Sequence, residues 1–199
     1  MLFLLVSIYI FITIAIGIFA ARKVKTTNDF AVAGRSLSLP VVIATVFATW
    51  FGAEAIFGVS STFIDEGLSG VVADPFGASL CLVIAGVIFS KYLYKFNFST
   101  LSTFYRKRYN RSIEVIITLI IILSYLGWVA AQITAIGLVL KVITNGFIGE
   151  SLGMILGTIA VLSYTTLGGM FSVAIIDLVQ MIVIIIGLII TVYFVVELS

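Results

Sequence analysis

ATWFGAEAIFG, residues 48–58, combines features that an ordinary membrane-spanning helix avoids. It lies within an apolar run, yet it carries Glu54 between Gly52 and Gly58. A carboxylate at the bilayer centre costs about 2.5–3.5 kcal/mol on insertion scales, so it normally faces a protein interior or a water-filled cavity. Each glycine lowers helix propensity by about 1 kcal/mol, which permits local unwinding. Unwound backbone in a membrane lines a cavity, where its carbonyls can coordinate a hard cation such as sodium.

Two interpretations of this stretch follow. The first is a discontinuous helix with an ion or solute site at its break. The second is a continuous helix whose glycines allow close helix packing and whose Glu54 is buried by hydrogen bonding.

The composition around this stretch indicates an integral membrane protein. The chain is 62% hydrophobic and 10% charged, whereas soluble domains are roughly 45–50% apolar and about 25% charged. One cysteine and no histidine exclude a disulfide framework and a Cys-based metal site and argue against an enzyme. We therefore expect an all-α membrane protein without catalytic residues and without a cofactor.

Apolar runs of about 20 residues, the length that crosses a bilayer, divide the chain into one transmembrane domain of about six helices. The first run, residues 2–21, has its cations after it, so we interpret it as a retained span and not as a cleaved signal peptide. The predicted spans are residues 2–21, 39–63, 69–90, 112–142, 152–167 and 171–197.

The cations set the predicted orientation, because positively charged loops stay on the cytoplasmic side. Residues 22–35 and 91–111 together hold ten of the eleven Lys and Arg residues, and both segments follow an odd-numbered span. This pattern predicts an outside N-terminus in a cell membrane, with a bacterial cytoplasmic membrane as the expected location. We interpret the basic loops as solvated segments that set topology, and they form no single patch for nucleic acid.

Two further segments interrupt the apolar pattern. SYLGWVAAQ, residues 124–132, places Trp128 and Gln132 on one helical face, which suits a small polar or zwitterionic solute. SVAIIDLVQ, residues 172–180, places Asp177 and Gln180 on one face about two turns inside the membrane. Asp177 is expected either to face a cytoplasmic water path that receives a cation or to pair with a basic loop. The aromatic residues of 124–132 could alternatively serve only helix packing.

With these segments the chain resembles the sodium:solute symporter family, which includes proline, pantothenate, galactose and choline symporters. The matching pieces are DFAVAGRSLSLP (29–40), ATWFGAEAIFG (48–58), TLSTFYRKRYN (100–110) and YTTLGGMFSVAIIDLVQ (164–180). The resemblance implies a LeuT-like fold, in which a peripheral first helix precedes two five-helix repeats of inverted topology. Spans two to six would form the first repeat, and span two would be its broken helix.

The resemblance also implies roles for individual residues. The backbone carbonyls of Ala48 and Phe51 would form half of a sodium site, with sodium as the coupling ion. Asp177 and Gln180 would lie on the inward sodium path. The residues expected beside the solute, an amino acid or organic cation, are Trp50, Gly52, Ala53, Glu54, Trp128 and Gln132.

The chain departs from the family pattern in length, because members have about eleven to fifteen spans. We therefore expect the N-terminal part of a symporter: a fragment, a truncated gene product, or a half that pairs with another chain. The second repeat would complete the site, and without it this part should not transport. The alternative from a different class is a non-transporting membrane interaction protein that packs against a full-length partner. A pore formed by oligomers would need a polar face repeated along several spans, and only scattered polar positions are present.

Overall fold

The computed structural model describes residues 2–96 and 100–198. Within these ranges the chain is helical and contains no strand, which confirms the expected all-α class. The α-helices are α1 (Leu2–Ala21), α2 (Thr27–Val32), α3 (Leu39–Trp50), α4 (Val59–Glu66), α5 (Ala78–Ile84), α6 (Ser90–Lys95), α7 (Leu101–Arg108), α8 (Arg111–Ile143) and α9 (Glu150–Leu198). Short 3₁₀ segments cover Ala33–Arg35 and Gly67–Ser69, and π-helical segments cover Glu54–Gly58, Val72–Gly77 and Ala85–Phe89.

The chain forms two compact units. The terminal unit contains Met1–Trp50 and Ile133–Ser199, and the middle unit contains Phe51–Gln132. The boundary between the units falls beside the predicted break on one side and beside Gln132 on the other. Each unit is described by itself below.

Several helices are long and apolar enough to cross a membrane. In the described part of the chain, these stretches are Leu2–Ala21, Val72–Lys95, Arg111–Ile143 and Glu150–Glu197. A fifth candidate is the pair Thr27–Arg35 and Leu39–Trp50, whose axes differ by 106°. These helices overlap the six predicted spans, but the number of crossings stays a prediction.

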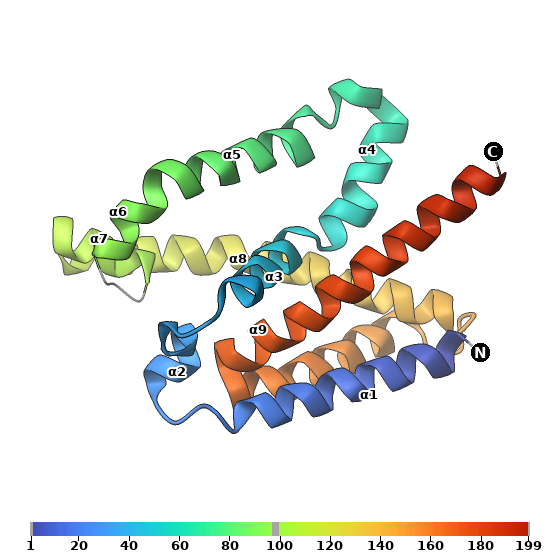
Figure 1. The fold of residues 1–199 in the computed structure, drawn as a ribbon, viewed down its shortest axis with the longest axis horizontal. Helices are drawn as coiled ribbons and strands as arrows, with labels where there is room; N and C mark the ends of the chain where they lie inside the picture. The colour runs from blue at the N-terminus through green and yellow to red at the C-terminus, as the bar shows by residue number, and fades with distance from the viewer. Residues whose placement is uncertain (1, 97–99, 199) are drawn as a thin grey trace. The chain divides into compact units, whose positions relative to one another are not determined.

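Helix α9 contains the tight turn that the sequence predicts between spans five and six. It has 49 residues, which would extend roughly 70 Å if straight, more than twice the thickness of a hydrocarbon core. Gly169 interrupts it with φ 48° and ψ −140°, a conformation that residues with a Cβ rarely adopt. The orange first part and the red second part of α9 run in opposite directions (Figure 1).

The core of the terminal unit lies where α1 packs against α9. The missing side chain of Gly17 allows the contact, because a Cβ there would lie 2.6 Å from Cβ of Tyr164 and 2.8 Å from Cδ1 of Ile176. Ser172 is fully buried and donates a hydrogen bond from Oγ to the Gly17 carbonyl over 2.6 Å. Close backbone approach combined with a hydrogen bond is a common way for membrane helices to associate.

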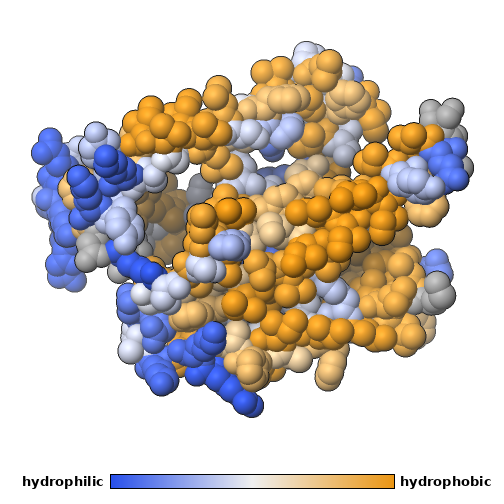
Figure 2. Space-filling view, viewed as in Figure 1, coloured by the Kyte–Doolittle hydropathy of each residue, from blue (hydrophilic) through white to orange (hydrophobic). Residues whose placement is uncertain are grey.

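Most large apolar side chains of the terminal unit point outward. Phe11 on α1 is 75% exposed and Ile189 on α9 is 65% exposed. The outer sides of α1 and α9 are accordingly hydrophobic in Figure 2. Such a surface cannot remain in water, so these helices need contact with lipid or with further protein.

The short helix α2 begins with a capping box. The backbone N–H of Asp29 donates to Thr26 Oγ1 over 3.1 Å, and the backbone N–H of Thr26 donates to Asp29 Oδ2 over 3.0 Å. The N–H of Lys25 also donates to Asp29 Oδ2, over 3.1 Å. These bonds satisfy amides that the first turn of a helix leaves without partners.

Candidate solute and sodium site

The helix that enters the candidate site is interrupted where the sequence predicts a break. Helix α3 ends at Trp50, residues 51–52 form a bend, and helical structure resumes at Ala53 as a π-helical segment, Glu54–Gly58. The described chain therefore does not form the continuous helix of the alternative interpretation. A helix end exposes carbonyl oxygens that have no amide partner in the next turn.

Gln132 binds the backbone at this break within the middle unit. Its Oε1 accepts a hydrogen bond from the backbone N–H of Ala53 over 3.1 Å. The approach depends on Gly52, because a Cβ at that position would lie 3.1 Å from Oε1 and 3.3 Å from Nε2 of Gln132. Three of the residues expected beside the solute, Gly52, Ala53 and Gln132, thus lie together.

The other end of the Gln132 amide retains its donor capacity. Nε2 is buried and has no hydrogen-bond partner among the described residues. A buried amide nitrogen with two hydrogens is costly to leave without an acceptor. The arrangement can therefore offer a donor to a polar ligand at the break.

Glu54 and Trp128 are also in the middle unit. Glu54 is exposed, and none of the described residues forms an ion pair with its carboxylate. Trp128 is half-buried and makes an edge contact with Tyr125, with 6.0 Å between ring centroids and 87° between ring planes. The two rings lie on the same side of α8, as their spacing predicts.

Ala48 and Trp50 lie in the last turn of α3 and belong to the terminal unit, whereas Phe51 is the first residue of the middle unit. The Trp50 side chain is 47% exposed. In the described residues no three acidic or cysteine side chains gather to hold a metal ion.

Asp177 and Gln180 occupy the core side of α9 in the terminal unit. Asp177 is only 8% exposed, and its carboxyl lies beside the side chain of Thr45 of α3. The Thr45 hydroxyl donates to the Val41 carbonyl over 3.0 Å. Because a hydroxyl has one hydrogen, Thr45 can donate to Asp177 only by giving up this bond.

Gln180 has a different set of partners. Its side chain lies beside that of Tyr9 of α1, and the Thr13 hydroxyl donates to the Tyr9 carbonyl over 2.9 Å. Thr45, Tyr9 and Thr13 were not among the residues predicted from the sequence. The spacing of Tyr9 and Thr13, four residues apart in an otherwise apolar helix, is a signal that could have identified the second pair.

Known proteins with similar sequences are solute transporters. The sodium:solute symporter family matches residues 30–198. High-affinity choline transporter 1 of Drosophila melanogaster is 32% identical over 189 residues, which cover 92% of this chain and 30% of that protein. High affinity choline transporter 1 of Homo sapiens is 28% identical over 200 residues, covering 96% and 34% of the two chains.

A bacterial relative that is named for a different solute matches as well. The sodium/glucose cotransporter of Vibrio parahaemolyticus is 26% identical over 196 residues, which cover 94% of this chain and 35% of that protein. The chain spans about a third of the length of these curated relatives. No solved structure matches it. The match over residues 30–198 shows that the chain belongs to the sodium:solute symporter family.

Proposed function

We propose that this chain forms part of a sodium-coupled symporter of a small organic solute, and that the interruption at residues 51–52 lies at its binding site. The observation that carries the proposal is the Gln132 amide, which is bound to the Ala53 N–H and lies against Gly52. It keeps the break in place and leaves Nε2 with a hydrogen to offer. Membership of the family and the transporter relatives support the same activity.

In this proposal sodium binds first and prepares the solute site. The backbone carbonyls of Ala48 and Phe51 supply two of its oxygen ligands, and hydroxyl groups from a second five-helix repeat of a LeuT-like fold supply the others. Sodium bound there stabilises an outward-open state, and rocking of the core helices then releases both ligands inside. Asp177 and Gln180 lie on the inward path of the ion.

The solute class we infer is a small organic cation related to choline. Trp50, Trp128 and Tyr125 provide aromatic faces, which attract cations electrostatically. The Glu54 carboxylate has no ion-pair partner among the described residues, so it is available to balance a positive charge. The names of the relatives in Drosophila melanogaster and Homo sapiens support choline as the first solute to test.

The remaining elements of the proposal concern the assembly. The six predicted spans, an outside N-terminus and a location in the cell membrane fit the alternation of basic segments along the chain. A second repeat, in the same polypeptide or in a partner chain, completes the cavity. The non-transporting interaction protein is the outcome that a negative transport result would favour.

Sodium-dependent uptake into vesicles tests the proposal. The chain is reconstituted by itself and also joined to the second repeat of a relative, and radiolabelled choline, proline, pantothenate and glucose are supplied with and without a sodium gradient. We expect choline to accumulate only in vesicles that contain the joined protein, and only when a sodium gradient is present. Correct insertion without uptake of any solute would contradict the proposed function.

Two substitutions in the joined protein connect uptake to the site. Glu54→Ala should weaken solute binding, whereas Glu66→Ala, which removes an exposed carboxylate from α4, should leave it unchanged. Asp177→Asn should slow sodium-driven uptake. Equal affinity in the two glutamate variants would remove Glu54 from the site.

A further inference from the structure

Six exposed cations gather at one end of the middle unit, and the transport proposal does not use them. They come from α6, from α7 and from the start of α8, and no acidic residue lies between the first and the last of them in the sequence. We call this group the basic corner. Its members are Lys91, Lys95, Arg106, Lys107, Arg108 and Arg111.

Contacts between the three helices hold the basic corner together. Phe96, which follows α6, packs edge-on against Phe104 of α7 with 5.9 Å between ring centroids. Lys107 Nζ donates to the Phe96 carbonyl over 3.5 Å. Arg106 of α7 forms an ion pair with Glu114 of α8, with 3.5 Å between Nη1 and Oε2. Helix α7 is thus tied to both of its neighbours.

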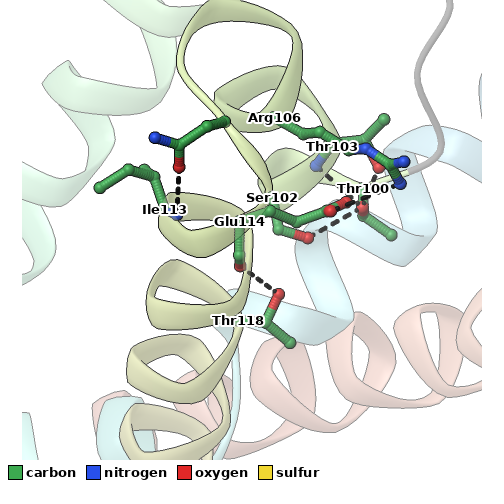
Figure 3. A network of polar contacts seen from close by, with 8 residues as sticks. Thr100, Ser102, Thr103, Arg106, Ile113, Glu114 and Thr118 are labelled. Carbon is green, nitrogen blue, oxygen red and sulfur yellow. Dashed lines mark hydrogen bonds and ion pairs between the residues drawn. The ribbon is translucent and has the colours of Figure 1, made fainter.

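Polar caps fix the ends of these helices (Figure 3). Thr100 Oγ1 accepts a hydrogen bond from the Thr103 N–H at the start of α7, over 3.3 Å. Asn110 Oδ1 accepts one from the Ile113 N–H at the start of α8, over 3.0 Å. Thr118 donates to the Glu114 carbonyl over 2.7 Å, within the same network. The cations are therefore presented by helices with defined ends.

Most of this positive charge is not balanced by acidic residues in the described part of the chain. Within the described ranges, Glu114 is the acidic residue that pairs with the basic corner, and it pairs with Arg106. Lys91, Lys95, Arg108 and Arg111 are exposed and have no acidic partner among the described residues. A group of this charge attracts an anionic partner.

The position of the basic corner indicates which anion it meets. Lys95 ends one candidate span, Val72–Lys95, and Arg111 begins the next, Arg111–Ile143. Exposed tyrosines accompany the cations: Tyr94 is 78% exposed and Tyr109 is 64% exposed. Tyrosine is enriched at the level of lipid headgroups, where one end of its ring is apolar and the other is wet.

We propose that the basic corner binds the headgroups of anionic phospholipids. Clusters of four to eight Lys and Arg residues directly beside a membrane span are typical of such binding, because the phosphates are negatively charged and lie at that depth. The interaction is separate from the candidate solute site. It would attach the α6–α7–α8 corner to the membrane surface.

A photoactivatable phosphatidylglycerol tests the proposal. The full chain is reconstituted in phosphatidylcholine vesicles that contain the probe, irradiated, and digested so that mass spectrometry locates the crosslinks. Competition with unlabelled phosphatidylglycerol measures relative affinity against phosphatidylcholine. We expect crosslinks in the peptides of residues 91–96 and 100–111, with a preference for phosphatidylglycerol that falls at high salt.

Three matched variants distinguish a located site from general attraction. The triple substitution Lys107→Gln, Arg108→Gln and Arg111→Gln should lower the preference about tenfold or more, since each cation near an anionic surface contributes several-fold. The charge-conserving set Lys107→Arg, Arg108→Lys and Arg111→Lys should retain it, which controls for misfolding. The set Arg22→Gln, Lys23→Gln and Lys25→Gln removes the same charge from the other basic segment and should leave the preference within about twofold.

Two results would overturn the proposal. Equal losses in the two glutamine sets would show that the net charge of the chain attracts the lipid without a site. Crosslinks spread along the helices with no preference for phosphatidylglycerol would show that the basic corner is solvated or meets an acidic protein partner. Neither result depends on transport, so the proposed function is tested separately.

Discussion

Gln132 Oε1 accepts a hydrogen bond over 3.1 Å from the backbone N–H of Ala53, a residue 79 positions earlier in the chain. The bond joins α8 to the first turn after the interruption that follows α3. A side-chain amide in this position replaces the hydrogen bond that an unbroken helix would provide. The interruption is thus stabilised from outside its own helix.

Replacing Gln132 by Leu should destabilise the chain. The Ala53 N–H would lose its acceptor, and an unsatisfied buried donor costs about 1–3 kcal/mol. Denaturant unfolding of the detergent-solubilised chain measures the loss. Ser124→Ala removes an exposed hydroxyl from the same helix and should change stability by less than about 0.5 kcal/mol. Equal stabilities of the two variants would show that the bond contributes nothing.

The two glycines that flank Glu54 should respond differently to alanine. A methyl group at Gly52 would lie 3.1 Å from Gln132 Oε1, whereas one at Gly58 meets no atom within 4 Å. Gly52→Ala should therefore cost about 1–3 kcal/mol through overpacking. Gly58→Ala should be neutral or stabilise by up to about 1 kcal/mol through helix propensity.

Unfolding of both glycine variants under the same conditions measures the difference. In the transporter that contains a second repeat, Gly52→Ala should also raise the KM for solute, because the Gln132 amide must move. A KM unchanged in Gly52→Ala would place Gln132 outside the solute site.

Ser172→Ala should loosen the packing of α1 on α9. The buried Ser172 hydroxyl donates to the Gly17 carbonyl over 2.6 Å, and its removal should cost about 1–2 kcal/mol. Ser7→Ala is the control, because exposed Ser7 donates over 2.8 Å to the Phe3 carbonyl of its own helix. Amide hydrogen exchange along α1 should rise in Ser172→Ala and stay unchanged in Ser7→Ala; similar exchange in both would contradict the role given to Ser172.

The capping box of α2 should depend on pH. The hydrogen bond from the Lys25 amide, followed by those from Thr26, lowers the pKa of the Asp29 carboxyl below its usual 3.8. A lowered pKa means that the ionised carboxylate stabilises α2 fully above pH 3.8 and that this contribution is lost as pH falls through the folded-state pKa. A carbon-13 NMR titration of the Asp29 carboxyl measures this value, and Thr26→Val should raise it toward 3.8. A wild-type value at or above 3.8 would contradict the bonding described for the cap.

Much of the fold could be predicted because membranes impose strict local rules. Runs of about 20 apolar residues predict membrane-spanning helices. Each predicted run contains helix in the structure, and the number of membrane crossings stays a prediction. The turn near Gly169 could be predicted because a chain of such length must reverse, and glycine tolerates the required positive φ. The interruption after Trp50 was one of two interpretations of the sequence, because Glu54 and two glycines conflict with an ordinary span but could also serve close helix packing.

The partners of the polar residues could not be predicted in the same way. The sequence predicts that Asp177 faces a water path or a basic loop, whereas in the structure its carboxyl lies beside Thr45 of α3. The Gln180 side chain lies beside Tyr9 of α1. The resemblance implies only a peripheral position for this first helix, and it says nothing of a polar contact there. Spacing along one helix shows which residues share a face, but it carries no information about which other helix that face meets.

The amino-acid sequence by itself determined that this protein is helical and that it belongs in a membrane, because hydrophobicity and backbone propensity act over a few neighbouring residues. It gave a broken second apolar run as one of two interpretations, and the structure decided between them. Only the tertiary structure decided that Gln132 binds Ala53, that Ser172 binds Gly17, and that Thr45 meets Asp177. These pairs are separated by many residues, and they form because polar groups removed from water must find partners on whichever helix packing brings near.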